Sequence, residues 1–195
     1  ETEVDTIRRY VSIVAQAGGR GYQLMDNLVG WARDNLDGVE VEAGVHDLRE
    51  ITSTALGTLR FMAELKDVSI EEQTGKSLVL VDPFQIAAVI RNLVSNAIKF
   101  SHEKSTVVIT TALENDRVRL SVSDTGAGMM ADTVAMVRDL GLNESLSGTA
   151  GEQGSGIGLM LCQSFLRRHG SVLEVRSEPG QGTVVSFTLP LAEAE

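Results

Sequence analysis

Apolar residues recur with helical spacing at the start of the chain, between residues 4 and 36. One heptad position is occupied by Val4, Val11, Gly18, Met25 and Ala32, and the position three residues later by Ile7, Val14, Gly21 and Leu28. Such a seam predicts a long helix that packs against another helix. A loop over residues 17–21 stays open as the alternative, because each interior glycine costs about 1 kcal/mol relative to alanine. Residues 37–45 are predicted to form a linker.

A second helical pattern begins at Asp47, with one apolar side made of Leu48, Ile51, Ala55, Leu59 and Met62. The apolar run at residues 78–81 predicts a short strand. Asp82, the proline after it and Gln85 then predict a helix start, because Asp caps a first turn, Pro fits the first helical position and Gln completes a capping box. The helix is predicted to run over residues 83–100.

The second half of the chain alternates between strand and helix patterns. Two β-branched, alternating segments joined by a polar turn predict a hairpin, and a Gly-rich, irregular region follows it. A helix ending at Gly170 comes next, since glycine is a preferred residue just beyond a helix end. The ranges are 106–113 and 118–123 for the hairpin, 124–158 for the irregular region, 157–169 for the helix, and 171–176 and 183–189 for two closing strands. This order predicts an α+β fold, a two-layer sandwich with helices on one face of a mixed sheet.

The net charge of the chain argues against two classes of binding partner. The formal net charge is −10 and the pI is about 4.8, which argues against nucleic acid and against an anionic membrane surface as the main partner. Cys162 is the single cysteine, so intrachain disulfides are excluded, and we expect a cytoplasmic location and a core position for its thiol. Because no apolar run could cross a bilayer and the chain opens on Glu1, we expect a piece of a longer protein that can itself be membrane-anchored.

Polar residues form a stripe on the helix predicted over residues 83–100. Asn92, Asn96 and Lys99 lie together on the face opposite Ile86, Val89, Ile90, Leu93, Val94 and Ala97. Asparagine is a poor helix former, so two of them beside a lysine suggest amide oxygens for a metal and an ammonium for phosphate. A solvated polar face is the alternative reading.

Two glycine-rich segments are candidates for ligand binding. Asp124 follows a predicted strand and precedes Gly126 and Gly128, which let backbone approach a ligand closely; the carboxylate could accept from an exocyclic amine, as in adenine. An ordinary turn is the alternative. Residues 151–159 run into a helix, whose free N–H groups and dipole favour phosphate; a flexible linker is the alternative there.

Together these segments resemble the nucleotide-binding domain of the GHKL superfamily, and most closely its sensor histidine kinases. Residues 92–101 resemble the N box, 124–128 the first Gly box and 154–159 the second. The stretch 177–183, with the strand residues after it, is similar to the close of kinase domains. The resemblance covers about residues 47–191.

The resemblance implies a Bergerat α/β sandwich that binds ATP and Mg²⁺. It implies that Asn96 holds Mg²⁺, that Asn92 and Lys99 lie near the phosphates, that Asp124 accepts from the adenine amine, and that Thr183 contacts adenine through water. It further implies an adenine pocket shaped by Gly126, Gly128 and Met129, and a phosphate cradle of Gly154, Ser155, Gly156, Ile157, Gly158 and Leu159. Residues 129–153 would be a lid, with aliphatic Val134, Met136, Val137, Leu140 and Leu142 where the family often has Phe.

The implied function is that of the ATP-binding catalytic part (residues 46–195) of a two-component histidine protein kinase. Residues 1–36 resemble the second helix of its dimerisation domain, so the phospho-accepting histidine is expected outside this chain. His46 stands after that helix and lacks the acceptor context, and His102 and His169 are expected to be structural. The implied partners are a histidine-bearing dimerisation helix, a response regulator receiver domain and a second copy in the intact protein.

Two other functions compete with the kinase. One is a non-catalytic nucleotide-binding regulatory module, which an absent acceptor histidine would also suit. The other is an ATPase of the gyrase, chaperone or mismatch-repair branches, which needs a catalytic Glu in the N-box helix. Ala88 and Arg91 occupy the nearby positions, so that branch ranks last.

Overall fold

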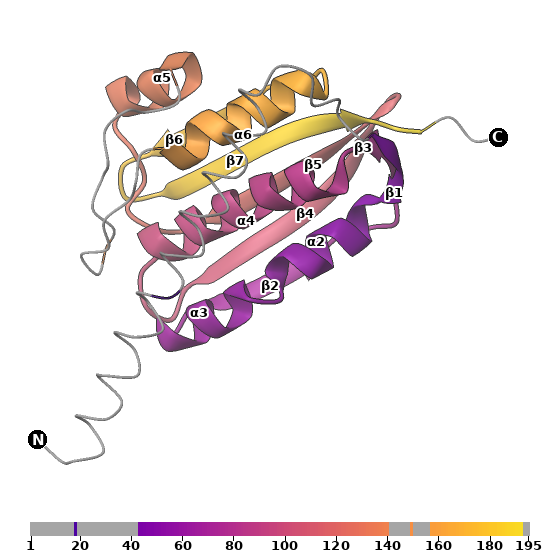
Figure 1. Ribbon diagram of the computed structural model, residues 1–195. Helices are drawn as coiled ribbons and strands as arrows, with labels where there is room; N and C mark the ends of the chain where they lie inside the picture. Colours follow the sequence, from indigo (N-terminus) through magenta and orange to yellow (C-terminus); the bar gives the residue numbers. More distant parts are fainter. Residues whose placement is uncertain (1–17, 19–42, 141–148, 150–156, 193–195) are drawn as a thin grey trace, which may run out of the picture.

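The computed structural model describes residues 43–140, Thr149 and 157–192, together with Gly18 (Figure 1). The long helix predicted over residues 4–36 and most of the predicted linker lie outside the described residues. The described elements are β1 (Gly44–Asp47), α2 (Leu48–Leu56), α3 (Leu59–Leu65), β2 (Ser69–Gln73), β3 (Leu78–Val81), α4 (Pro83–Phe100), β4 (Thr106–Glu114), β5 (Arg117–Asp124), α5 (Ala131–Leu140), α6 (Ile157–Arg168), β6 (Glu174–Glu178) and β7 (Gly182–Pro190).

A five-stranded mixed sheet and a layer of helices on one of its faces make up most of the domain, as the sequence predicted. The sheet has five strands in the order β2-β4-β5-β7-β6. Strands β2 and β4 are parallel and the other neighbours are antiparallel. Helices α2, α3, α4 and α6 lie over one face of this sheet, and α5 stands beside β6 at its edge (Figure 1). The core lies between the two layers.

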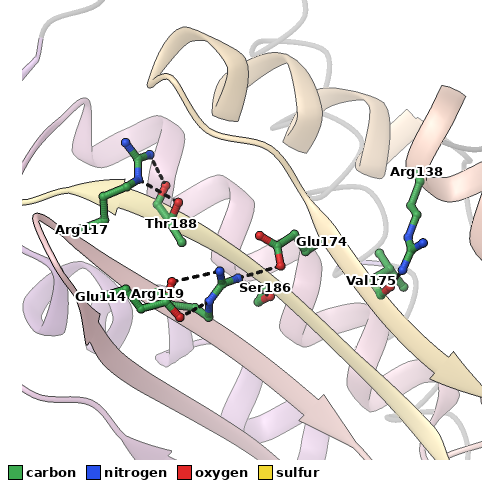
Figure 2. Close-up of polar contacts among 8 residues, drawn as sticks. All are labelled: Glu114, Arg117, Arg119, Arg138, Glu174, Val175, Ser186 and Thr188. Atoms are coloured by element: carbon green, nitrogen blue, oxygen red, sulfur yellow. Dashed lines mark hydrogen bonds and ion pairs between the residues drawn. The ribbon is translucent and has the colours of Figure 1, made fainter.

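The alternation of residues along β5 shows why one face of the sheet is covered and the other is not. Val118, Leu120 and Val122 are buried under the helices, whereas the residues between them, Arg119 among them, point to the other face. There the Arg119 guanidinium contacts Glu114 at 2.6 Å, Glu174 at 2.9 Å and Ser186 at 3.1 Å (Figure 2). The outer face is therefore held by ion pairs that join three strands.

Helix α4 matches the predicted range, but its start differs from the prediction. The Asp82 carboxylate caps the first turn by accepting from the N–H groups of Phe84 at 2.9 Å and Gln85 at 3.2 Å. The capping box is wrong: the Asp82 N–H donates to His169 Nε2 at 3.0 Å. The buried Oε1 of Gln85 has no hydrogen-bond partner among the described residues. The His169 side chain, which directly follows α6, therefore takes the acceptor role that the capping box assigns to the Gln85 side chain.

Three further predictions are corrected. The single helical pattern from Asp47 is broken into α2 and α3 at Gly57 and Thr58, both poor helix formers. Strand β1 begins at Gly44, inside the predicted linker, and pairs with β3 in a small antiparallel sheet. Strand β2, a polar edge strand, was not predicted at all.

Helix α5 lies in the region predicted to be irregular, whereas α6 and β7 follow the prediction closely and β6 begins three residues later than predicted. Helix α6 ends at Arg168, and Gly170 takes a positive φ of 61° beyond it. The N–H of Ser171 then donates to Leu166 O at 2.8 Å, which closes the helix end and delays β6 until Glu174. Within the described part of the chain, no helix is long and apolar enough to cross a membrane.

Candidate nucleotide-binding site

Asp124 stands at the end of β5, directly opposite Thr183 on β7. Its side chain is buried, and Oδ1 accepts from the Gly126 N–H at 2.9 Å. Burial raises the pKa of this carboxyl, and the N–H groups of Gly126 and Thr183 act in the opposite direction because they stabilise the charged form. The strand end therefore holds a desolvated carboxylate whose local donors do not use its full capacity to accept hydrogen bonds.

Three glycines bring backbone close together around this carboxylate. A Cβ on Gly126 would lie 2.0 Å from Phe100 O, one on Gly128 would lie 2.0 Å from Glu178 O, and one on Gly182 would lie 2.0 Å from Asp124 O. Gly128 and Gly182 also have positive φ values of 66° and 90°. Gly126 and Gly128 were predicted to let backbone approach a ligand; in the structure they, together with Gly182, let backbone segments of the chain itself lie close together.

Ser177 joins the turn after Asp124 to the hairpin of β6 and β7, and it was not singled out from the sequence. Its hydroxyl oxygen accepts from the Met129 N–H at 2.8 Å, its proton can go to Gly182 O at 2.8 Å, and Thr183 Oγ1 lies 2.9 Å away. Ser177 and Thr183 are register partners in the hairpin of β6 and β7. The glycines of the connecting turn are the sequence signal from which this pairing could have been predicted.

Asn92 of α4 does not lie on a solvated face, and Asn96 beside it is partly exposed. Asn92 is buried, and its Oδ1 accepts from Nδ2 of Asn96 at 3.1 Å. Gly158, near the start of α6, lies against Asn92, so a Cβ there would come within 2.1 Å of Asn92 Nδ2. The structure therefore brings Asn92, Asn96 and Gly158 together and excludes the solvated-face reading for Asn92.

The carboxyl end of α4 lies at the same place. Phe100 O accepts from the Ala127 N–H at 3.1 Å, which ties the helix end to the turn after Asp124. The Lys99 ammonium lies 4.8 Å from the centre of the Phe100 ring. The first Gly box and the N box are thus joined by a direct backbone hydrogen bond.

Lys66 and Thr149 also contact this helix end, and no motif pointed to them. Thr149 donates from its hydroxyl to Ser101 O at 2.7 Å and from its N–H to Lys99 O at 3.2 Å. Lys66 Nζ donates to Lys99 O at 2.5 Å and to the Thr149 hydroxyl at 2.8 Å. Two donors from distant segments therefore satisfy the last carbonyls of α4, which a helix cannot pair internally.

Helix α5 follows the Asp124 turn and is fastened on both sides. Arg138 donates to Val175 O at 2.6 Å, on the edge strand β6 (Figure 2). The buried Gln163 of α6 donates to Val137 O at 2.9 Å. Of the remaining predicted residues, Met129 and Leu159 pack against the core and Ile157 begins α6. Gly154, Ser155 and Gly156 lie outside the described residues, as do residues 141–148 and 150–153 of the predicted lid.

The side chains near Asn96 suit a cation that takes most of its ligands from water and from a bound substrate. The described residues contain no group of three or more His, Cys, Asp or Glu side chains that could hold a metal by themselves. Asn96 spends its amide N–H on Asn92, so Oδ1 is the atom suited to a cation. One amide oxygen fits Mg²⁺, which keeps several waters and takes its other ligands from substrate phosphates.

A family model matches more than half of the chain, over residues 81–193. It is described as "Histidine kinase-, DNA gyrase B-, and HSP90-like ATPase". The chain belongs to this ATPase family. The match takes in α4, the Asp124 turn, α6 and Thr183, which are the elements that meet at the site.

The curated proteins similar to this chain include histidine kinases. It is 30% identical over 197 residues to an uncharacterised sensor-like histidine kinase of Rhizobium meliloti, a match of 96% of this chain and 36% of that protein. It is 28% identical over 191 residues to histidine protein kinase DivJ of Caulobacter vibrioides, a match of 96% of this chain and 32% of that protein. The chain therefore spans about a third of the length of these curated relatives.

Solved structures of kinases share the fold of this ATPase-family chain. Full-length ShkA, crystallised with AMPPNP, matches with a TM-score of 0.74 and 26% identity, over 96% of this chain and 39% of that one. The mycobacterial sensor histidine kinase MprB matches with a TM-score of 0.67 and 20% identity, over 78% of this chain and 99% of that one. The second likeness shows the fold alone.

Proposed function

We propose that this chain is the ATP-binding catalytic part of a histidine protein kinase, which transfers the γ-phosphoryl group of Mg·ATP to a histidine outside the chain. The observation that carries the proposal is the contact of the turn after Asp124 with the end of α4, through the Ala127 N–H and Phe100 O. Family membership and the sensor-kinase relatives support it.

Asp124 selects adenine in this proposal. An ionised carboxylate only accepts hydrogen bonds, and the exocyclic N6 amine of adenine donates. Guanine presents a carbonyl oxygen at the equivalent position, so it would face the carboxylate with two acceptors opposed. Thr183 and Ser177, joined at 2.9 Å, offer hydroxyl groups next to Asp124 for a water on the adenine edge.

The triphosphate would lie between α4 and the start of α6. Asn96 would supply an amide oxygen to Mg²⁺, which neutralises charge on the phosphates when it is bound. Lys99 would contribute an ammonium from the same face of the helix. The N-terminus of α6 adds N–H groups and the positive end of its dipole, and Gly158 lets that terminus approach Asn92.

Transfer to an acceptor fits the site better than hydrolysis does. Helix α4, from Pro83 to Phe100, contains no Asp or Glu, so it supplies no carboxylate to activate water. In the transfer, the bond from the γ-phosphorus to the β–γ bridging oxygen breaks and a P–N bond to the imidazole forms. ADP leaves and the imidazole proton passes to solvent. Positioning and charge neutralisation are the contributions the protein must make.

The histidines of the described residues support an acceptor outside the chain. His169 is buried, with Nε2 accepting from Asp82 N–H and Nδ1 2.7 Å from Phe165 O, so neither nitrogen is available to attack phosphorus. His46 lies on β1 and His102 follows α4. The acceptor helix, the receiver domain and the homodimer remain parts of the proposal.

Phosphotransfer in trans tests this function. A histidine-bearing dimerisation hairpin is added to the chain with Mg·ATP labelled at the γ-phosphate. We expect phosphate on the hairpin that is stable in base and lost in acid, as a phosphoramidate is. The label should require the acceptor histidine of the hairpin.

Two variants make the result specific. Asn96→Ala should abolish transfer, and Asp116→Asn, a change on the exposed turn between β4 and β5, should leave it intact. Tight nucleotide binding without transfer to any histidine-bearing hairpin would overturn the kinase proposal. That result would favour a nucleotide-binding regulatory module instead.

A further inference from the structure

A row of three polar side chains crosses the sheet at one end of β5, β7 and β6, which lie side by side (Figure 1). Asp124 is the register partner of Thr183, and Thr183 is the register partner of Ser177. Side chains two residues apart on a strand share a face, so the neighbouring row on that face consists of Val122, Val185 and Val175. That row is apolar and packs into the core. The polar row is therefore an exception on the face that the helices cover.

The two members of this row that would meet a base are deeply buried. Asp124 and Thr183 are each 7% exposed. A buried acceptor that faces another acceptor, or a donor that faces a donor, is costly because water does not compensate for the missing hydrogen bond. The direction of each hydrogen bond in the row therefore decides which ligand the row can bind.

The three contacts of the Ser177 hydroxyl fix the direction of these hydrogen bonds. The Met129 N–H, 2.8 Å away, can only donate, and Gly182 O, also 2.8 Å away, can only accept. A hydroxyl has one proton, so Ser177 gives its proton to Gly182 and accepts from Met129. The third contact, 2.9 Å from Thr183 Oγ1, must then carry the Thr183 proton. Thr183 is therefore the donor to Ser177.

This assignment leaves the Thr183 hydroxyl only lone pairs to offer a ligand. Its neighbour Asp124 also only accepts when it is ionised. The N–H groups of Gly126 and Thr183 are directed at the Asp124 carboxylate and stabilise its charge. Two adjacent side chains thus present acceptors at the proposed adenine site. Such a pair suits a base with an amine at position 6 and opposes one with a carbonyl oxygen there.

We propose that Ser177 is a positioning residue that sets base specificity: by taking the Thr183 proton it keeps the Thr183 hydroxyl an acceptor, which favours a 6-amino purine over a 6-oxo purine. Ser177 acts through Thr183. The inference rests on the proposed function, because Asp124 and Thr183 are assigned to the base there. Without the Ser177 hydroxyl, Thr183 can rotate and turn its proton toward a 6-oxo group, directly or through a water.

ATP and inosine triphosphate (ITP) test this assignment, because they differ only at the base edge in question. Inosine has a 6-oxo group and an N1–H where adenine has a 6-amino group and a bare N1. Each is titrated with Mg²⁺ into the wild type and into Ser177→Ala by calorimetry. The ratio of ATP affinity to ITP affinity should fall about fivefold in Ser177→Ala, which is within the range of one hydrogen bond. A ratio equal to that of the wild type would overturn the inference.

Two further single variants separate specificity from a loss of structure. Ser177→Thr keeps the hydroxyl and should keep the wild-type ratio. Ser186→Ala removes a serine hydroxyl from the same hairpin, but on the outer face beside Arg119, and should also keep it. Loosening of the hairpin alone would weaken both nucleotides alike. Should Ser177→Ala not fold, Ser177→Cys, whose thiol is only a weak acceptor, is expected to lower the ratio in the same direction.

A double variant shows whether Ser177 acts through Thr183. Thr183→Val removes the hydroxyl and keeps the shape, so adding Ser177→Ala to it should leave the ratio unchanged. A fall of the same size with and without the Thr183 hydroxyl would contradict the inference. Failure of the wild type to bind either nucleotide would overturn the proposed function and this inference together. ATP binding with a ratio that ignores Ser177 would overturn this inference alone.

Discussion

The side-chain amide of Asn92 fills the space that a Cβ atom on Gly158 would need. Nδ2 of Asn92 would lie 2.1 Å from that Cβ, and its Cγ 2.8 Å. The N box and the second Gly box are therefore fitted to each other, and Gly158 is required by its neighbour, since its backbone needs no positive φ. The start of α6 can reach the asparagines of α4 because this residue has no side chain.

Gly158→Ala should weaken Mg·ATP binding at least tenfold, because the added methyl must displace Asn92 or the start of α6. Forcing a group into a packed contact costs about 1–3 kcal/mol, so a lower melting temperature is also expected. Calorimetric titration and thermal unfolding measure the two effects. Gly75→Ala is the control, since a Cβ there meets nothing closer than 3.9 Å.

A double variant shows whether the contact is the cause. Asn92→Ala removes the clashing amide, so adding it to Gly158→Ala should restore much of the lost stability without restoring nucleotide binding. Strictly additive losses of stability would contradict the contact as the reason for the glycine.

Acidification should weaken ATP binding earlier than an ordinary aspartate would predict. Burial raises the pKa of Asp124, and the protonated form cannot serve as a charged acceptor for the adenine amine. As pH falls through the raised pKa, affinity should fall, while binding changes little around neutrality. Titrations over a series of pH values measure this, and an affinity that is constant down to the normal aspartate range would contradict it.

The same raised pKa predicts that ionisation of Asp124, which favours ATP binding, lowers the stability of the protein without nucleotide. Because the folded state holds the Asp124 proton more tightly than the unfolded state does, ionisation at neutral pH lowers the free energy of unfolding. Asp124→Asn should therefore melt higher than the wild type without nucleotide at neutral pH. The difference should shrink as pH falls through the raised pKa, which thermal unfolding at several pH values can follow.

The elements that could be predicted from the sequence are those specified by local patterns, and the missed elements depend on contacts between residues far apart in the chain. Helix α4 and the hairpin of β4 and β5 were predicted because their signals are local: an Asp cap, a Pro at the first position, and strict alternation. Strand β2 escaped because it is a polar edge strand in which Ile70 is the one inward apolar residue. Its pairing with β4 is a long-range event that no local pattern encodes.

Helix α5 and the start of α4 show the same limit. Helix α5 is held by Arg138 and Gln163, whose partners lie on other elements. The Gln85 capping box was a sound local inference, but His169, 87 residues away, took the Asp82 N–H instead. At the site, local motifs singled out Asn92, Asn96 and Asp124 as candidates, whereas the contacts of Ser177, Lys66 and Thr149 are created only by the fold.

His169 should matter for stability because it links two helix ends. His169→Leu leaves the Asp82 N–H without its acceptor and Phe165 O without the ring nitrogen 2.7 Å away. Losing such buried partners costs about 1–3 kcal/mol. Urea unfolding of His169→Leu against His102→Leu, an exposed site where about 0.5 kcal/mol or less is expected, measures the difference. Equal losses in the two variants would contradict the link.

Cys162 should be chemically silent in the folded protein. Its thiol is fully buried and its pKa is raised to about 12, because burial disfavours the thiolate that reacts. A thiol reagent at pH 8 should label it only as fast as the protein unfolds, so labelling in denaturant should be complete while native labelling is slow. Rapid stoichiometric labelling of the native chain would contradict the core position.

Calorimetric titration of nucleotide tests the central claim most directly. Mg·ATP and Mg·GTP are titrated into the wild type, into Asp124→Asn and into the surface control Asp116→Asn. The account predicts ATP binding in the wild type and the control, GTP binding at least a hundredfold weaker, and loss of ATP binding in Asp124→Asn. Absence of ATP binding in the folded wild type, or equal ATP affinity in Asp124→Asn, would contradict it.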